Sequence, residues 1–202
     1  MKTNQSLPSR RALLASALAL AFTAALPAAP AGAKPPRRPD VYLLRGFANV
    51  FSKGIDQIGL DLQAAGVEAH VEGHAAWRMV VNRIVTDRQQ NGPGPVILIG
   101  HSLGANAVIS IAEALEKRGI KVDYLASFAA TGPDPLPGNV RYAVNYYFSS
   151  HGWGLPLVAG PRFRGKLENR DFSGIKDVGH FNIEKQTALQ AQAHQDLPFE
   201  QL

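Results

Sequence analysis

From residue 40 onward, the chain alternates short aliphatic segments with longer segments of helical spacing, and this alternation limits the folds it can adopt. The aliphatic segments have the length and composition of strands, and in the others apolar residues recur every three or four positions. Strands joined through helices require right-handed crossovers, which make the strands parallel and place helices on both faces of the sheet. We therefore expect an α/β protein with one domain over residues 40–202 and a mostly parallel sheet of about six strands. The predicted strands cover residues 41–44, 67–71, 95–99, 122–130, 140–148 and 166–172, and the predicted helices cover residues 55–65, 75–88, 105–115 and 183–195.

The five residues Gly100-His101-Ser102-Leu103-Gly104 join the most apolar predicted strand to the clearest predicted helix. A G-x-S-x-G string in this context is typical of a nucleophile elbow, a sharp turn that exposes a serine hydroxyl above the sheet. Gly100 and Gly104 are needed there because strand and helix approach too closely for side chains. Ser102 also lies at a helix N-terminus, which stabilises developing negative charge. The alternative is that Ser102 is an ordinary helix N-cap flanked by glycines.

With this elbow and this order of elements, the sequence resembles the α/β-hydrolase family, particularly small bacterial lipases and esterases that bear Gly-His-Ser-Leu-Gly. The resemblance implies a minimal α/β-hydrolase fold in which Ser102 is the nucleophile and its acid and histidine follow in that order. It also implies two N–H donors for the oxyanion, one from Leu103 and one from the loop after the first strand. That loop, residues 44–49, is similar to the family's His-Gly-x loop, so the N–H of Phe47 is the expected second donor, with Asn49 and Ser52 able to orient the loop.

The catalytic base predicted by the resemblance is His180. It lies in a loop just before the last predicted helix, where the family places its histidine, and Gly179 beside it lets the loop approach the elbow. His151, which directly follows a predicted strand, is the second candidate. The alternative role for His180 is that of a helix-capping or partly buried surface histidine.

The triad acid is harder to assign, because many relatives carry it at a strand tip where this chain has Ala129 and Ala130. Asp134, between two prolines in the following loop, is the first candidate, although such a residue is also common in turns. Asp171 is the second candidate, and Asp177 or no acid at all are the remaining alternatives. Without an acid, a Ser-His dyad would work at a reduced rate.

These residues predict a serine hydrolase that cleaves carboxylic esters through an acyl-enzyme. A thioesterase or amidase of the same fold is one alternative, and a binding protein that has lost a working triad is another. Only 77 residues separate Ser102 from His180, with no long apolar insertion. We therefore expect an open site without a large lid, which favours short or soluble esters over interfacial lipids.

No cofactor or metal is expected, and a small-molecule or lipid ester is the expected partner of a monomeric protein. The chain has no cysteine, which excludes thiolate metal sites and a cysteine nucleophile. His70 and His74 span a predicted strand end, so they share no helix face for a metal. No glycine-rich phosphate loop or dinucleotide fingerprint occurs.

Residues 1–33 have the pattern of a secretory signal peptide, with a basic head, an apolar run over residues 12–26 and small residues before a cleavage point after Ala33. The adjacent Arg10 and Arg11 favour a twin-arginine route, with a plain Sec signal as the alternative. The apolar run is too short for a permanent membrane span, so we expect a bacterial protein that is periplasmic or extracellular. A Pro-rich leader, residues 34–39, would follow.

The signal peptide also explains much of the basic charge. The whole chain has a net charge of +5, but without the three basic residues of the signal it has 18 basic against 16 acidic residues, or +2. No basic patch interleaved with aromatic residues is present, so nucleic-acid binding is not expected.

Overall fold

The computed structural model describes residues 37, 39–47, 52–150 and 153–195, without the side chains of residues 192–195. The predicted signal peptide, most of the Pro-rich leader, Asn49 and the alternative base His151 lie outside these residues. Export of the protein therefore stays a prediction.

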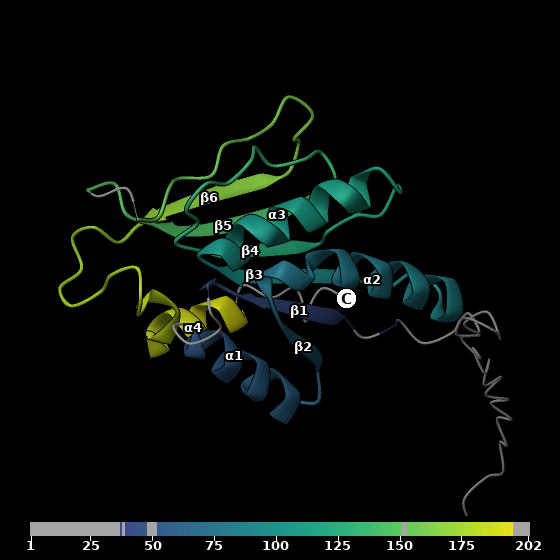
Figure 1. Ribbon diagram of the computed structural model, residues 1–202, viewed down its shortest axis with the longest axis horizontal. Helices are drawn as coiled ribbons and strands as arrows, with labels where there is room; N and C mark the ends of the chain where they lie inside the picture. Colours follow the sequence, from purple (N-terminus) through teal and green to yellow (C-terminus); the bar gives the residue numbers. More distant parts are fainter. Residues whose placement is uncertain (1–36, 38, 48–51, 151–152, 196–202) are drawn as a thin grey trace, which may run out of the picture. The chain divides into compact units, whose positions relative to one another are not determined.

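Six strands form one sheet in the order β2-β1-β3-β4-β5-β6, and every neighbouring pair is parallel (Figure 1). The predicted α/β class and sheet are thus confirmed, with all pairs parallel. Each predicted strand is present, although the fourth is shorter than predicted because Val122 contributes only an isolated bridge with Val140. The strands are β1 (Asp40–Arg45), β2 (Glu68–Gly73), β3 (Val96–His101), β4 (Tyr124–Phe128), β5 (Tyr142–Tyr147) and β6 (Lys166–Asp171).

In the part of the chain that the structure describes, four α-helices flank the sheet, and two short 3-10 turns precede two of them. The predicted last helix over residues 183–195 is partly wrong. Its first turn is a 3-10 turn, and the extended backbone of Gln186 separates this turn from the α-helix. The helices are α1 (Lys53–Ala64), α2 (Trp77–Asn91), α3 (Leu103–Glu116) and α4 (Thr187–Gln195), and the 3-10 turns are η2 (His74–Ala76) and η3 (Ile183–Lys185).

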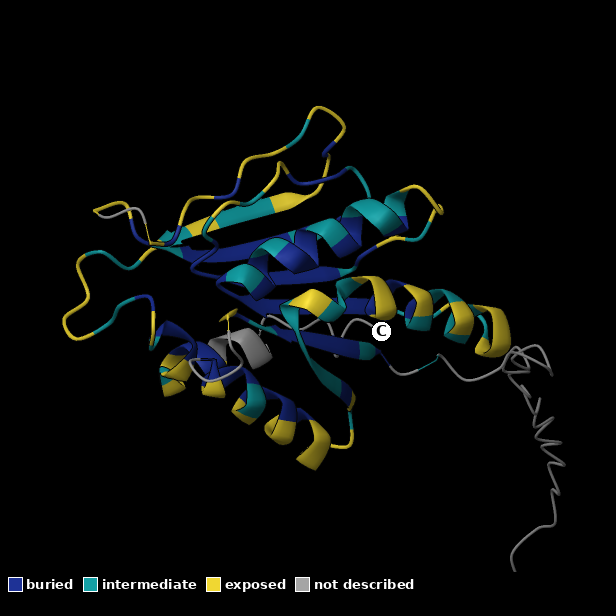
Figure 2. Cartoon of the chain, in the orientation of Figure 1, coloured by how far each residue is buried: buried dark blue, intermediate teal, exposed yellow. Residues whose placement is uncertain are grey.

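Two apolar clusters pack on opposite faces of the sheet, because successive strand residues point to opposite sides. Leu98 packs with α2 and α3 on one face, and Ile97 packs with α1, η3 and α4 on the other. β3 is buried along its whole length, as its unbroken aliphatic sequence predicts. In Figure 2 the central strands are buried, whereas the outer faces of α1 and α2 are exposed.

The carboxyl ends of β1, β3 and β4 lie side by side, because β3 pairs with β1 on one side and with β4 on the other. The chain leaves β1 toward β2 and returns to β3, so the strand order reverses between β1 and β3. Sites in open parallel sheets form at such a point, outside the carboxyl ends of the strands. Gly46, Ser102 and Ala129 immediately follow these three strands.

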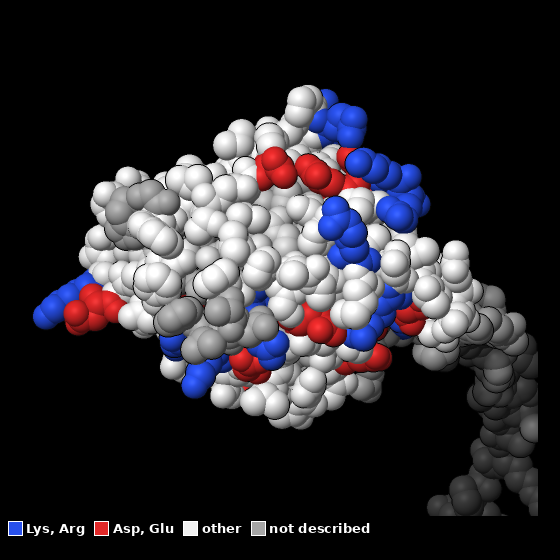
Figure 3. Space-filling model, viewed as in Figure 1, with Lys and Arg blue, Asp and Glu red and all other residues white. Residues whose placement is uncertain are grey.

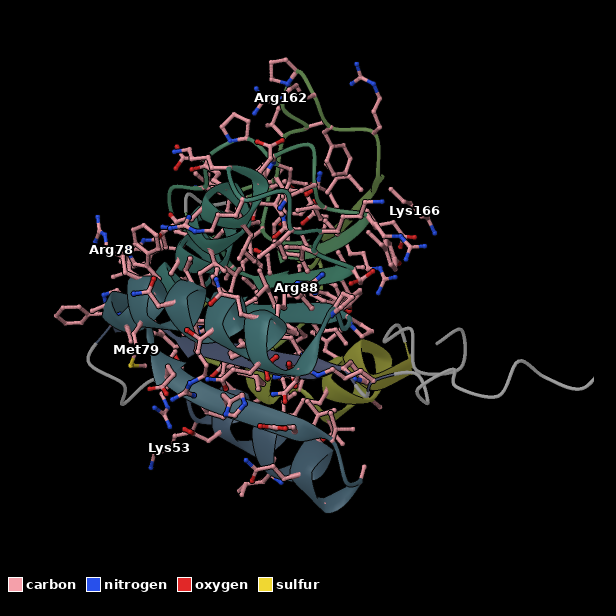
Figure 4. The ribbon with its side chains drawn as sticks, turned by 90° about the vertical axis from the view of Figure 1, so that its right-hand side faces the viewer. Lys53, Arg78, Met79, Arg88, Arg162 and Lys166 are labelled. Carbon is pink, nitrogen blue, oxygen red and sulfur yellow. The ribbon has the colours of Figure 1, made fainter. Side chains whose placement is uncertain are left out.

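On the face shown in Figure 3, Lys and Arg lie among Asp and Glu. Figure 4 shows Lys53, Arg78, Arg162 and Lys166 at separate places on the surface. Among the described helices, none is both long enough and apolar enough to cross a membrane.

Candidate active site

Ser102 occupies the sharp turn between β3 and α3, with φ 57° and ψ −122°. A positive φ is uncommon for a residue other than glycine, and such strained residues cluster at functional sites. A Cβ on Gly100 would lie 2.3 Å from the Gly104 carbonyl oxygen, and one on Gly104 would lie 2.1 Å from the Leu44 carbonyl oxygen. Both glycines are therefore required by backbone contact, which is the arrangement of a nucleophile elbow.

Gly46, the first residue after β1, lies directly against the serine. A Cβ on Gly46 would lie 2.9 Å from the Ser102 Cβ, and the Gly46 N–H donates to the Ser52 Oγ at 2.8 Å. Phe47 follows, with 68% of its surface exposed. Leu103 is the first residue of α3, where backbone N–H groups lack an intrahelical acceptor. The two predicted oxyanion donors thus belong to segments that flank Ser102.

His180 lies beside Ser102, although the two are 78 positions apart in the sequence. Its Nε2 is 3.0 Å from the Ser102 Oγ, and both residues are buried. Asn182 holds the loop that carries His180: its Oδ1 accepts from the Gly179 N–H at 2.8 Å, and its Nδ2 donates to the Asp177 carbonyl at 2.9 Å. The sequence-predicted nucleophile and base are therefore brought within hydrogen-bond distance.

A cavity of about 650 Å³ opens above this pair. Its mouth is aromatic: Phe47, Trp153 and Phe181 are each more than half exposed. The Trp153 and His180 rings meet edge to face, with centroids 5.2 Å apart. Such a mouth suits an apolar group attached to the reacting centre. The lining residues are Phe47, Ser52, His101, Ser102, Leu103, Thr131, Trp153, His180 and Phe181.

His101, inside the elbow, links the loop that carries His180 to Ser52, which lies just before α1. Its Nε2 lies 2.7 Å from the His180 carbonyl oxygen, and its Nδ1 lies 2.8 Å from the Ser52 Oγ. Burial is the main cause that lowers the pKa of His101 to about 4, opposed by the hydrogen bond to the His180 carbonyl. The imidazole is therefore neutral near pH 7. This linking role was not predicted from the sequence, which identified His101 only as part of the elbow.

The end of β4, where many relatives carry an acid, is closed by packing. Ala129 has φ 50° and is fully buried. A Cβ on Gly154 would come within 3.2 Å of both the Cα and the Cβ of Ala129, and the Leu155 N–H donates to the Ala130 carbonyl at 2.7 Å. The segment after residue 152 thus occupies the space that a larger side chain at position 129 would need.

Asp134, the first candidate for the acid, is exposed and lies beside α3. Its charge contributes, after burial, to the raised pKa of Glu113. Glu113 is 11 residues beyond Ser102, which is roughly 16 Å along an α-helix. Among the described residues, no hydrogen bond or ion pair joins Asp134 to His180. The structure therefore does not bring Asp134 to the Ser102–His180 pair.

The other two candidates for the triad acid are Asp171 and Asp177. Asp171, at the end of β6, accepts hydrogen bonds from Ser149 and Ser173, which hold its pKa well below the usual range. Asp177 is exposed, with φ 62°. Within the described residues, neither carboxylate bonds to His180. Asp171 nevertheless ties the loop after β5 to the loop before His180.

We expect Asp134→Asn to retain kcat within about threefold of the unmodified protein, because an exposed carboxylate that is not bonded to Ser102 or His180 is screened by water and acts on them only weakly. Asp171→Asn should lose more, because it frees two loops beside the site. Steady-state hydrolysis of a soluble ester measures both. A loss on the order of 10⁴-fold in Asp134→Asn would instead identify Asp134 as the triad acid.

Two polar residues of the site were not predicted from the sequence. Asn106, one turn into α3, accepts the Thr131 N–H at 3.1 Å and donates to the Thr131 Oγ1 at 3.1 Å, which holds Thr131 against the cavity. Glu184 is fully buried behind His101. The helical spacing around Asn106 gave no signal for its role, and no local pattern indicated the burial of Glu184, because that burial depends on the packing of η3 against α1. No cluster of three or more metal-binding side chains occurs among the described residues.

No protein-family profile and no curated protein sequence matches the chain. Solved structures do resemble it. The RedJ thioesterase from the prodiginine biosynthetic pathway of Streptomyces coelicolor is 13% identical, covering 95% of this chain and 100% of that one, with a TM-score of 0.50. The type II thioesterase BorB from the borrelidin biosynthetic cluster is 15% identical, covering 81% and 93%, also with a TM-score of 0.50. A protein from Xanthomonas campestris assigned to the hydrolases of the α/β superfamily is 16% identical, covering 80% and 100%, with a TM-score of 0.44.

At these identities the comparisons bear on the fold alone. The all-parallel sheet, the elbow after β3 and the likeness to RedJ and BorB together show that the chain has the α/β-hydrolase fold. The fold predicted from the sequence is thereby confirmed.

Proposed function

We propose that the protein is a serine hydrolase that cleaves carboxylic esters. The observation that carries this proposal is the 3.0 Å approach of the His180 Nε2 to the Ser102 Oγ, at a strained elbow beneath an apolar-rimmed cavity. A hydroxyl with an adjacent imidazole is the arrangement that activates a serine nucleophile.

In the proposed reaction, the Ser102 Oγ attacks the acyl carbon while His180 takes its proton at Nε2. The carbonyl oxygen becomes an oxyanion, which accepts hydrogen bonds from the N–H groups of Leu103 and Phe47. Collapse of this intermediate breaks the ester bond, and His180 returns the proton to the departing alcohol. Water then attacks the acyl-enzyme by the same route, which releases the acid and restores Ser102.

The direct test is covalent labelling of the folded protein by a fluorophosphonate probe, followed by mapping of the modified peptide. We expect the adduct on Ser102, because the probe reacts with activated serines. A folded protein that does not label would overturn the enzyme proposal and favour the binding-protein alternative.

A thioesterase is the second candidate, and it is favoured by the shared fold of two proteins that are themselves thioesterases. Comparison of kcat/KM for an oxygen ester and a thioester of the same acyl group separates the two activities. A higher kcat/KM for the oxygen ester supports our proposal, and the reverse order supports the thioesterase.

We expect kcat/KM to rise with acyl length across soluble esters, and Trp153→Ala to remove much of that rise. Each methylene buried against the aromatic mouth contributes up to about 0.8 kcal/mol. For an octanoyl ester, the variant should lose roughly tenfold in kcat/KM, as expected for 1–2 kcal/mol of apolar contact. The acetyl ester should change little.

Val158→Ala is the matched control for this prediction, because Val158 is 61% exposed and does not line the cavity. A chain-length profile that is identical in Trp153→Ala and in the unmodified protein would show that the acyl group binds elsewhere.

A further inference from the structure

Glu184 is a fully buried carboxylate next to the proposed site, and the reaction described above does not use it. It lies in η3, four residues after His180. Neither of its carboxylate oxygens has a hydrogen-bond partner among the described residues. Buried carboxylates are normally paired or hydrogen-bonded, because desolvation of a charge is costly. Burial accordingly raises the pKa of Glu184 to about 7.

The carboxylate sits between the start of α1 and the ring of His101. Its Oε2 is 3.6 Å from the His101 Nε2. A Cβ on Gly54 would lie 2.8 Å from the Glu184 Cγ, so the N-terminus of α1 packs directly against this side chain. The N–H groups of Glu184 and Gly54 lie near the carboxylate, outside hydrogen-bond geometry, and partly oppose the rise in its pKa.

Among the described residues, few titratable groups face this carboxylate. His101 faces it from β3, and the Lys185 Nζ lies 3.9 Å from its Oε1 within η3. On α1, Lys53 is exposed and Asp56 is paired with Arg45. From α4, the neutral Gln190 donates to the Glu184 carbonyl at 2.8 Å.

The hydrogen bonds of His101 determine where its proton lies. The His180 carbonyl can only accept, so the His101 Nε2 must donate to it, and in a neutral ring the Nδ1 is then an acceptor. The Ser52 hydroxyl therefore donates to that Nδ1, and its Oγ accepts the Gly46 N–H. A negative charge on Glu184, close to the Nε2–H, favours this tautomer over the other.

We propose that Glu184 is an anionic residue that positions the site. Through His101 and Ser52 it holds the loop that carries His180 in place relative to the loop after β1, which carries the predicted oxyanion donor Phe47. Its negative charge also favours protonation of His180. The inference rests on the proposed function, because it assigns Glu184 a role in that reaction. The His101 and His180 rings lie 5.2 Å apart, so the charge of Glu184 acts on the imidazolium that forms when Ser102 attacks.

The test is Glu184→Gln, which keeps the shape of the side chain and removes its charge. We expect kcat to fall roughly tenfold, the effect of a charge several ångströms away at an effective dielectric constant near 20. In the unmodified protein Glu184 gains a proton near pH 7, and its charge favours protonation of the neighbouring His180, so the pair together sets the acid limb of the kcat/KM profile. Without the Glu184 carboxylate, this limb should move to lower pH, by about one unit. Glu113→Gln is the matched control: Glu113 also has a pKa raised by burial, but it lies on α3 away from His180, so its variant should leave the limb in place.

An unchanged kcat and an unchanged limb in Glu184→Gln would overturn the proposal, and so would a lower kcat without a shift, which is the result of a purely structural role. If the variant does not fold, the proposal is tested instead by nitrogen-15 NMR of the histidines in the unmodified protein. We expect His101 to be the neutral Nε2–H tautomer, with its signals responding to an ionisation near pH 7; another tautomer or no response overturns the proposal. Failure of the proposed function is distinguishable, because Ser102 in the unmodified protein would then not label.

Discussion

Ser102→Ala should lower kcat for a soluble ester roughly 10⁶-fold, the loss seen when a serine nucleophile that works with a histidine is removed. The structure gives the reason: the Ser102 Oγ lies at the elbow, lines the cavity and is 3.0 Å from the His180 Nε2. His180→Ala should cost about as much, because the hydroxyl is a weak nucleophile without its base.

A variant in which both Ser102 and His180 are replaced by alanine tests whether the two residues act together or independently. Since the two residues act as one unit, Ser102→Ala combined with His180→Ala should be no slower than either single variant. Steady-state kinetics on protein shown to be folded by circular dichroism makes the comparison. A Ser102→Ala variant that retains more than about one hundredth of the activity would exclude Ser102 as the nucleophile.

Gly104→Ala should destabilise the fold by about 3 kcal/mol, near the upper end of overpacking effects. The added Cβ would lie 2.1 Å from the carbonyl oxygen and 2.6 Å from the carbonyl carbon of Leu44. These are backbone atoms of the interior strand β1, so no side chain can rotate away to make room. The start of α3 must instead move away from β1, which would also displace Ser102.

Gly174→Ala is the matched control, because nothing lies within 4 Å of a Cβ at that position and its φ is not positive. It should change stability by about 0.5 kcal/mol or less. Urea unfolding of both variants measures the difference. A cost below about 1 kcal/mol for Gly104→Ala would mean that α3 can shift on β1 without strain, contrary to the close packing described above.

Much of the fold could be predicted from local pattern. The unbroken aliphatic run of β3 and the helical spacing of α3 identify a strand and a helix without any distant contact. The glycines on either side of Ser102 indicate the close approach that the structure shows at Gly100 and Gly104. The last helix was predicted too long, because the turn over η3 continues the helical spacing while the backbone of Gln186 does not.

The site was predicted less completely, and the acid shows why. The position of Asp134 after the fourth strand predicts an acid near the site, but the loop beyond Thr131 is held to α3 by Asn106 and continues along that helix. Sequence order gave no information on which way the loop turns. The burial of Glu184 depends on the packing of η3 against α1, which is likewise a contact between segments far apart in the chain.

The sequence by itself determined the α/β class and the elbow with its serine, because these depend on residue spacing within short segments, whereas His180 was indicated by the resemblance to the α/β-hydrolase family. Only the tertiary structure decided which loops meet at the carboxyl ends of β1, β3 and β4. That meeting places His180 on Ser102, links both to Ser52 through His101 and buries Glu184 behind them. The physical reason is that strand order and helix packing, rather than local spacing, set the distances between residues far apart in the chain.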